Sequence, residues 1–434
     1  MEKNINNRGQ SMMRFLLYSA IGIFMFFIPI TFMGKNSIPL DHLVGLIQKI
    51  PYYPKVYGLV LVFIGVILPF IDGSWKKTKT KKVFSIINIL AIPFVIMAVF
   101  EIGPAELMAP GMIPFIFGKI VVPVTTIVPI GSIFLALIVS YGLMEFVGVF
   151  MRPVMKPIWK TPGRSAIDAV ASFVGSYSIA LLITNRVYTE GKYTAKEAAI
   201  IATGFSTVSA TFMIIVANTL GLMDIWTKYF FITVFVTFLV SAITARIYPL
   251  RNKPEEFHKG IAGDLEKDVE GNKFNVALNT ALDVSASAPS LLENTKNNII
   301  DGFKLALGLA PSLLAIGTLG LIIAHYTPIF KFVGLIFYPV LALFRIPDAM
   351  NVSTALATSI AEMFLPAAFV AEAGFNTRFL VAVVCISEIL FFSASIPCMM
   401  ATEIPLKIKD YIIIWIERVI LSIIITIPII TIFF

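Results

Sequence analysis

The stretch EFVGVFMRPVM (residues 145–155) returns later in the chain as KFVGLIFYPVL (residues 331–341). The two copies match in one register, with an offset of 186 positions from Phe146 to Phe332. The matched pairs are Phe146/Phe332, Val147/Val333, Gly148/Gly334, Pro153/Pro339 and Val154/Val340. A repeat at a fixed offset indicates a duplicated structural unit. Each copy precedes two segments rich in small residues and a plain apolar span, so we expect one unit at 120–248 and the other at 299–434.

The composition indicates a membrane protein. Of the 434 residues, 58% are hydrophobic and 14% are charged, and the mean hydropathy is +0.88. Soluble domains are about 45–50% apolar and about 25% charged. Apolar runs such as IIIWIERVILSIIITIPIITIFF (412–434) are long enough to cross a bilayer, and they lack the short alternating segments of a membrane β-barrel. The sequence predicts an all-α polytopic membrane protein with about 10–12 transmembrane or half-membrane helices.

Apolar spans of this kind recur along the whole chain. We expect them near 15–33, 54–72, 83–101, 127–150, 163–184, 197–217, 225–248, 299–325, 351–372, 378–400 and 408–434. The segment 106–123 contains three prolines and two glycines and is expected to re-enter or break, which is tolerated at membrane depth only where protein or a water-filled cavity covers the backbone. The segment 42–50 has apolar residues at helical spacing and is expected to lie at the membrane interface.

Two parts of the chain lie outside the repeat. Residues 1–119 form N-terminal helices and the broken segment, and residues 249–298 form a charged linker that is too short and polar to have its own core. Basic runs such as WKKTKTKK (75–82) and ARIYPLRNKP (245–254) flank apolar spans, which marks the cytoplasmic side. We therefore expect the linker and the N-terminus to be cytoplasmic. Four full crossings in each unit, an even number, would make the repeats parallel. If one segment is a re-entrant arm, the number of crossings becomes odd and the repeats are inverted. We favour inverted repeats.

No motif for cofactor chemistry is visible in the sequence. A Walker A sequence, a dinucleotide glycine pattern and zinc-ligand spacing are all missing, which argues against an enzyme or a primary pump. Cys385 and Cys398 stand in apolar surroundings and are expected to be buried small residues. The net charge of +8 comes from basic runs beside apolar spans, so nucleic acid is not an expected partner.

Polar side chains form a stripe in the first small-residue segment of each repeat. Asp168, Ser172 and Ser176 share one helical face in the first repeat, and Asn351, Thr354, Thr358 and Glu362 share one in the second. The offset of 186 pairs Asp168 with Thr354 and Ser176 with Glu362. Each stripe thus carries one carboxylate, at opposite ends.

The next segments carry hydroxyls in the same manner. ATGFSTVSATF (202–212) places Thr203, Ser206 and Thr207 on one face, and CISEILFFSASIP (385–397) supplies Ser387, Glu388 and Ser393. Small and hydroxyl residues in spans often serve helix packing. A carboxylate inside a span costs about 2.5–3.5 kcal/mol, however, so it normally faces a cavity or a partner. Glu417 and Arg418 in the last span point about 100° apart, and we expect them to pair elsewhere or lie near a span end.

The Ser/Thr/Gly-rich segments on either side of a polar break resemble a known family. VASFVGSYSIALLITNRVYTEGKYTAKEAAIIATGFSTVSATFMIIVANTLGL (170–222) and its weaker copy at 351–405 resemble the Gate, or nucleoside-recognition, domain proteins, and within that group the YjiH-type membrane proteins. Relatives in this superfamily include concentrative nucleoside transporters and the membrane part of FeoB iron permeases. The resemblance implies a Gate-type helical fold and transport, without implying a substrate. The GTPase motif of FeoB is missing here, and the ligand motifs of nucleoside transporters cannot be matched residue by residue.

These observations predict a secondary transporter of a bacterial inner membrane. A small polar solute, nucleoside-like or amino-acid-like, is expected to bind between the two repeats, with Na⁺ or H⁺ as coupling ion and no other cofactor. The expected binding residues are Asp168, Ser172, Ser176, Thr203, Ser206, Thr207, Asn351, Thr354, Thr358, Glu362, Ser387, Glu388 and Ser393. Two alternatives stay open: a divalent-cation permease, and a non-transporting scaffold in the bilayer that pairs with another Gate-domain protein. A homo-oligomer is compatible with each of them.

Overall fold

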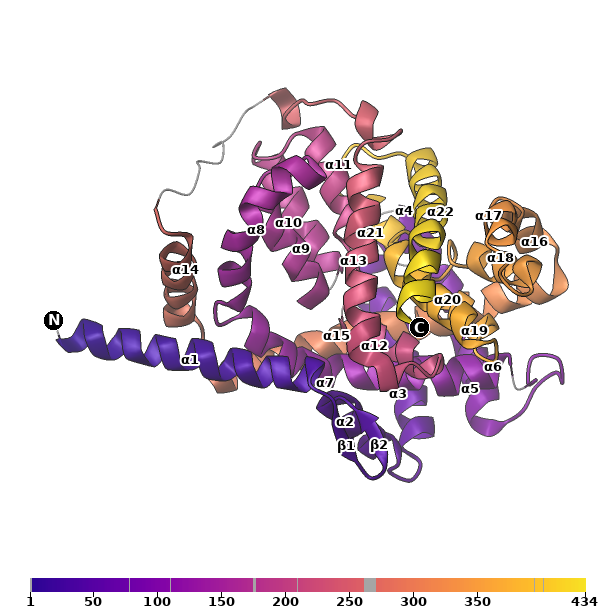
Figure 1. Ribbon diagram of the computed structural model, residues 1–434. Coiled ribbons are helices and arrows are strands. Elements are labelled where there is room, and N and C mark those ends of the chain that lie inside the picture. The colour runs from indigo at the N-terminus through magenta and orange to yellow at the C-terminus, as the bar shows by residue number, and fades with distance from the viewer. Residues whose placement is uncertain are drawn as a thin grey trace.

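The structure is a computed structural model that describes residues 2–77, 79–109, 111–174, 177–208, 210–260, 271–393, 395–400 and 402–434. Its secondary structure is almost entirely helical (Figure 1). One short hairpin, β1 (Ile30–Phe32) with β2 (Lys35–Ser37), pairs antiparallel with Thr31 opposite Asn36. The expected all-α class is confirmed.

Seven helical stretches in the described residues are long and apolar enough to cross a membrane. They are built from α1 (Glu2–Phe27), α3 (Tyr53–Ile71), α4 with α5 (Lys79–Asn88 and Ala91–Phe100), α6 with η2 and α7 (Ile113–Phe115, Ile116–Val121 and Val122–Val139), α13 (Trp226–Thr244), α15 (Leu291–Tyr326) and α22 (Ile408–Phe433). Large apolar side chains such as Phe231 and Phe235 lie exposed on their outer faces, where lipid takes the place of water. The protein is therefore a multi-pass membrane protein.

Three expected spans are each divided into two shorter helices, which agrees with the half-membrane helices that the sequence predicts. The pairs are α11 (Ala195–Gly204) with α12 (Ala210–Thr219), α18 (Ala349–Thr358) with α19 (Leu365–Phe369), and α20 (Phe375–Ser387) with α21 (Ser395–Met400). In the span expected near 163–184, α9 (Ser165–Val174) and α10 (Tyr177–Thr189) lie on either side of residues 175–176, which are outside the described residues. At the break after α11, the hydroxyls of Ser241 and Ser172 donate to the Gly204 and Phe205 carbonyls, which have lost their helical partners. Pro366 is accepted at the first turn of α19 because its missing N–H is not needed there.

The segment 106–123 behaves differently from expectation. Instead of re-entering or breaking, its second half begins a span, as α6 and η2 lead directly into α7. The π-helical turn at η2 comes just before Pro123, and such a turn accommodates a local mismatch in the hydrogen-bond ladder. The segment 42–50 lies largely within α2 (Pro39–Gln48), which packs against α7.

Part of the linker is also folded onto the rest of the protein. The helix α14 (Lys273–Ser287) contacts α1 and α8 (Leu143–Trp159), and it buries Ala281 and Leu282 beside Phe15. The linker therefore does not need its own core, because small residues on one face of α14 use an existing one. The remaining short helical turns are η1 (Ser74–Lys76), η3 (Met223–Ile225), η4 (Leu250–Asn252) and η5 (His258–Gly260).

The order of elements repeats along the chain. The series α7, α8, α9–α10, α11–α12 and α13 is followed by α15, α16 (Ile329–Gly334) with α17 (Tyr338–Leu343), α18–α19, α20–α21 and α22. Contacts repeat as well, since α11 packs on α13 as α20 packs on α22, and α10 meets α21 as α19 meets α12. The domain boundaries at 119, 248 and 298 stay a prediction.

The last helices of the two series run in opposite directions (Figure 1). Lys228 near the start of α13 lies over the ring of Phe434 at the end of α22, with 5.3 Å between Nζ and the ring centroid. At the other end, Lys253 beyond α13 bonds Asp410 at the start of α22, at 2.7 Å. This antiparallel pair is the arrangement that inverted repeats produce.

The duplicated stretch packs each series onto its first broken helix. A Cβ on Gly334 would come within 2.9 Å of the Ser353 carbonyl, because α16 and α18 approach closely. In the first series α8 also contacts α9. In the second series, the glycine of the repeated Phe-Val-Gly therefore lies at a helix contact that has no room for a Cβ.

Candidate functional site

Directly after each of the half-helices α11 and α20, a backbone N–H donates to the carbonyl two residues before it. The N–H of Thr207 donates to the Phe205 carbonyl at 2.7 Å, and the N–H of Leu390 donates to the Glu388 carbonyl at 2.7 Å. In the second turn the central residue, Ile389, has φ of 62°. A β-branched residue rarely adopts this left-handed conformation, and such strain is typically held in place at functional sites.

The two breaks of the second series lie against each other. Phe392 N–H donates to the Ile360 carbonyl at 2.8 Å, and Ser393 N–H donates to the Ala361 carbonyl at 3.0 Å. Backbone at membrane depth must have its polar groups satisfied by protein. This pairing brings Glu362 of the first break and Ser393 of the second together.

Glu362 is buried between these breaks, with 4% of the residue exposed. One carboxylate oxygen accepts a hydrogen bond from the Ser393 hydroxyl, and the other accepts the Phe364 N–H at 3.4 Å. A buried carboxylate is stable only with such partners. The expected residues Glu362 and Ser393 thus form one polar group across two breaks.

Glu388 is completely buried directly after α20. Its Oε2 accepts the indole N–H of Trp415 at 3.0 Å, and the same N–H lies 3.0 Å from the Ser359 hydroxyl. Within the described residues, the other oxygen of Glu388, Oε1, has no hydrogen-bond partner. A buried polar atom without a partner costs about 1–3 kcal/mol, so this oxygen is available to a bound group.

Arg418 on α22 joins the two series at the level of the breaks, and it too is completely buried. Its Nε donates to the Ser387 carbonyl at the end of α20, at 2.6 Å. Its Nη1 donates to the Ser241 hydroxyl on α13 at 3.1 Å, and Nη2 reaches the Thr237 carbonyl at 3.4 Å. It also lies within electrostatic range of Glu388.

The end of α11 is held by hydroxyl groups. The Ser241 hydroxyl lies 2.6 Å from the Gly204 carbonyl, and the Ser172 hydroxyl donates to the Phe205 carbonyl. A Cβ on Gly204 would come within 3.2 Å of Ser241, which explains a glycine at this end of the helix. Ser206, the next residue, has a buried hydroxyl that has no partner among the residues described.

Asp168 is held in a separate polar group. Its carboxylate accepts hydrogen bonds from Thr184 at 3.1 Å and from Tyr193 at 2.6 Å. It is buried, with 2% exposed, where α9, α10 and the approach to α11 meet. The described contacts do not join it to Glu362 or Glu388.

The remaining predicted residues lie in various positions. Thr203, Thr354 and Thr358 donate to carbonyls of their own helices, and Thr207 is buried at the α11–α12 break. The Ser387 hydroxyl pairs with Ser422 at 2.6 Å. Asn351 is exposed at the start of α18, where it bonds Asp348 at 2.7 Å, and Ser176 lies outside the described residues.

Sequence reasoning missed two members of this cluster. The sequence predicts Arg418 near a span end or in a pair elsewhere, and Trp415 is not among the expected binding residues. A signal for both exists, since Trp415, Arg418 and Ser422 stand at i, i+3 and i+7 on one face of the last span. Glu417 points to another face and is half-buried, as its separation from Arg418 around the helix requires.

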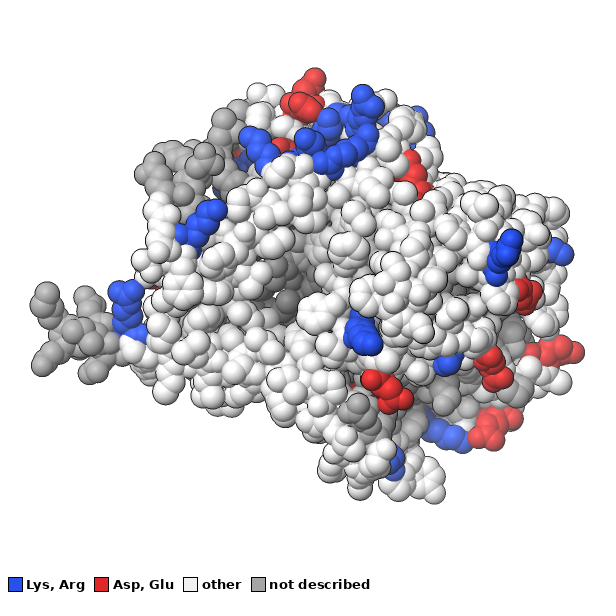
Figure 2. All heavy atoms as spheres, viewed as in Figure 1, with Lys and Arg blue, Asp and Glu red and all other residues white. Residues whose placement is uncertain are grey.

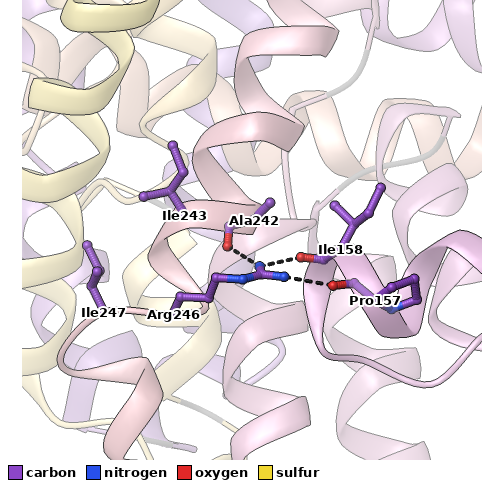
Figure 3. A pocket seen from close by; sticks show the side chains of 6 residues that line it. All are labelled: Pro157, Ile158, Ala242, Ile243, Arg246 and Ile247. Carbon is purple, nitrogen blue, oxygen red and sulfur yellow. Dashed lines mark hydrogen bonds between the residues drawn. The ribbon is translucent and has the colours of Figure 1, made fainter.

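Among the described residues, no group of three or more His, Cys, Asp or Glu side chains could hold a metal ion. Cys385 is buried and Cys398 is half-buried, both as free thiols. An open surface hollow of about 330 Å³ lies elsewhere, between α8 and α13, where the Arg246 guanidinium bonds the carbonyls of Pro157, Ile158 and Ala242 (Figure 3).

Charges are sparse on the visible face of the molecule. Figure 2 shows Lys and Arg side chains gathered along its upper edge, where Figure 1 places the turns that follow α13 and the start of α11. Arg251 is exposed in this part of the chain, and Lys196 there pairs with Glu255 at 2.8 Å. The middle of this face is mostly uncharged, as a lipid-facing surface requires, and further acidic and basic side chains lie toward its right and lower edges (Figure 2).

Comparison with known proteins identifies related chains. A family model described as Gate, nucleoside recognition, matches residues 121–223. An uncharacterized protein of Alkalihalophilus pseudofirmus is 33% identical over 96% of this chain and 93% of its own length. Solved structures of CNTnw are similar at 12% identity. An outward-facing variant has a TM-score of 0.49 over 97% of this chain and 92% of its own. The inward-facing substrate-bound state has a TM-score of 0.48, over 96% and 90% respectively.

Proposed function

This chain belongs to the Gate, or nucleoside-recognition, family of membrane proteins, and we propose that it is a secondary transporter whose solute binds at the breaks of α11 and α20. Broken helices leave free backbone groups near the middle of the membrane, and transporters use such groups to bind solutes and ions. In this chain the breaks come from both repeats and are tied together through Arg418 and Ser241.

The observation that carries this proposal is the pair of buried polar atoms after the two half-helices. Ser206 follows the cap of α11 and Glu388 is the cap of α20, and each has an atom without a partner in the described part of the chain. Unsatisfied buried polar groups are rare in folded proteins and need an explanation. A bound solute would satisfy these atoms by donating to Glu388 or by bonding Ser206.

The electrostatics favour a neutral, hydroxyl-bearing solute. The carboxylate of Glu388 accepts hydrogen bonds, as the ribose hydroxyls of a nucleoside would offer. A zwitterionic amino acid would also bring a carboxylate and would need a cation. Arg418, the cation described beside these breaks, already uses all three of its nitrogens. We therefore place nucleoside-like solutes before amino-acid-like ones.

Thermal unfolding of the purified protein in detergent tests the proposal. The panel would contain nucleosides, free bases, amino acids and divalent cations. A solute at 100 times its Kd should stabilise the protein by about 2.7 kcal/mol. We expect a nucleoside-like compound to raise the midpoint and Glu388→Gln to abolish the rise. Uptake of that compound into proteoliposomes then tests transport directly.

The matched control is Glu372→Gln, because Glu372 is an exposed carboxylate in the same repeat. It should keep the full response to the solute. A response to divalent cations that needs both Glu362 and Glu388 would favour a cation permease. No response across the panel, with Glu388→Gln as stable as the wild type, would favour the scaffold.

We also propose that the basic upper edge in Figure 2 is the cytoplasmic side of a bacterial inner membrane. Short basic loops are retained in the cytoplasm, and Arg246, Arg251 and Lys253 follow α13 directly. A variant with Arg251→Cys as its single cysteine, in which Cys385 and Cys398 are replaced, should then react with a membrane-impermeant maleimide only after the cells are opened. Reaction in intact cells would reverse this orientation.

A further inference from the structure

The ends of α11 and α20 place negative partial charge inside the protein. The last carbonyls of a helix lack intrahelical partners, and the helix dipole adds about half a negative charge there. Both ends are buried, at Gly204 and Ser387. In transporters, half-helix C-terminal ends of this kind coordinate coupling cations such as Na⁺.

Arg418 already supplies a cation to both ends. Its Nε donates to the Ser387 carbonyl at 2.6 Å, so it caps α20 directly. Its Nη1 bonds the Ser241 hydroxyl at 3.1 Å, and that hydroxyl lies 2.6 Å from the Gly204 carbonyl. One guanidinium thus serves two half-helices from different repeats.

The guanidinium is also a permanent charge. Arginine does not lose its proton in proteins, and its five donors suit several acceptors at fixed angles. Glu388, which follows Ser387 in the sequence, lies within electrostatic range of this charge. A coupling ion is therefore not needed to neutralise the two helix ends.

A second cation would be repelled from the same place. Two unit charges about 4 Å apart at an effective dielectric constant of about 20 repel strongly enough to weaken ion binding by about a thousandfold. Na⁺ would also have to take the Ser387 carbonyl away from the arginine.

We propose that Arg418 is a built-in cation that stands where Na⁺ would otherwise bind, so that this protein folds and binds its solute without Na⁺. The claim about solute binding rests on the proposed function. The claim that Arg418 occupies the place of Na⁺ does not.

The test is a titration of NaCl against choline chloride at constant ionic strength, with the unfolding midpoint as readout and no solute present. The wild type should show no saturable response to Na⁺. Arg418→Ser opens the space and leaves an oxygen, so it should unfold at a lower temperature and regain stability in a saturable manner with Na⁺. Arg418→Lys keeps a charge and should respond like the wild type.

Arg246→Ser is the matched control, because Arg246 also caps backbone carbonyls but lies at the α8–α13 hollow (Figure 3). It should show no Na⁺ response. A saturable Na⁺ response of the wild type or of Arg418→Lys would overturn the proposal, and these two proteins decide it even if Arg418→Ser does not fold. A folded Arg418→Ser that ignores Na⁺ would overturn it as well. If no solute raises the midpoint in the separate panel of nucleosides, bases, amino acids and divalent cations, that result would count against the proposed function alone.

Discussion

The indole N–H of Trp415 lies 3.0 Å from a carboxylate oxygen of Glu388 and 3.0 Å from the hydroxyl of Ser359. This single donor connects α22 with the breaks that follow α18 and α20. It leaves the second oxygen of Glu388 without a partner among the described residues. The indole therefore fixes the direction in which the free oxygen points, and Glu388 is positioned before any solute binds.

Trp415→Phe should destabilise the protein by about 1–3 kcal/mol, because it keeps most of the ring but removes the indole donor to the buried Glu388 carboxylate. The free energy of unfolding in detergent gives this value. Trp75→Phe serves as the control, since Trp75 is half-exposed beside Lys76 and Lys82, and it should change the free energy by less than about 0.5 kcal/mol. Equal effects of the two variants would show that the Glu388 contact does not contribute to stability.

Gly334→Ala should destabilise the protein by about 1–3 kcal/mol through overpacking. The added Cβ would meet the backbone of Ser353 at 2.9 Å, and backbone cannot move aside as a flexible side chain can. Gly308→Ala is the matched variant on α15, where a Cβ meets nothing within 4 Å. It should stabilise by about 0.5–1 kcal/mol, because alanine favours a helix interior. Thermal unfolding midpoints that move in the same direction for both variants would contradict this view of the α16–α18 contact.

The membrane class and the duplication could be predicted from the sequence because both are local signals. Long apolar runs define spans regardless of their neighbours, and the match of Phe146 with Phe332 needs only an alignment of the chain with itself. The helix breaks were not predictable in the same way. A segment such as 197–217 is long and apolar enough to read as one span, and the break depends on partners for the released backbone groups, such as Ser241 for Gly204.

Arg418 shows why the cluster could be predicted only in part. The sequence predicts that Arg418 pairs elsewhere or lies near a span end, but it does not identify the partners, because they lie 31, 177 and 181 positions away. Glu362 and Glu388 were found as candidates because a carboxylate in an apolar run stands out by itself. Their partners, Ser393 and Trp415, depend on how separate helices pack.

Acid should loosen the contact between the linker and the start of α11. The Lys196 ammonium, by hydrogen bonding and by its charge, lowers the pKa of the Glu255 carboxyl below its ordinary value of 4.5. A depressed pKa in the folded state gives stabilisation that is present above pH 4.5 and is lost as the pH falls further, through the folded pKa. The nearby amide N–H groups of Ala195 and Lys196 donate to the backbone carbonyls of Glu256 and Pro254. The hydrogen-exchange protection of these amides therefore reports on this contact.

We expect these protection factors to fall as the pH drops below about 4.5 in the wild type. Glu255→Gln should show lower protection at pH 6 and a flatter dependence on pH. The effect should be small, because Glu255 is largely exposed and such pairs are screened by solvent. A steep loss of protection that persists in Glu255→Gln would assign it to another acidic group.

Asp410→Ala should be much more harmful than Asp301→Ala, although each removes the carboxylate of an ion pair with lysine. Asp410 accepts from Lys253 at 2.7 Å and from the Lys407 N–H at 2.8 Å, and only 4% of its side chain is exposed. Its loss leaves a lysine that is itself 14% exposed without its partner, which should cost about 1.5–3 kcal/mol. Asp301 and Lys304 are 71% and 68% exposed at 3.0 Å, so their pair should contribute less than about 1 kcal/mol. Thermal unfolding in detergent separates the two cases.

Since Lys253 follows α13 and Asp410 begins α22, Asp410→Ala should also increase the exchange of amides at the start of α22, whereas Asp301→Ala should leave them unchanged. Equal losses of stability would mean that the bridge between the two repeats contributes no more than a surface pair.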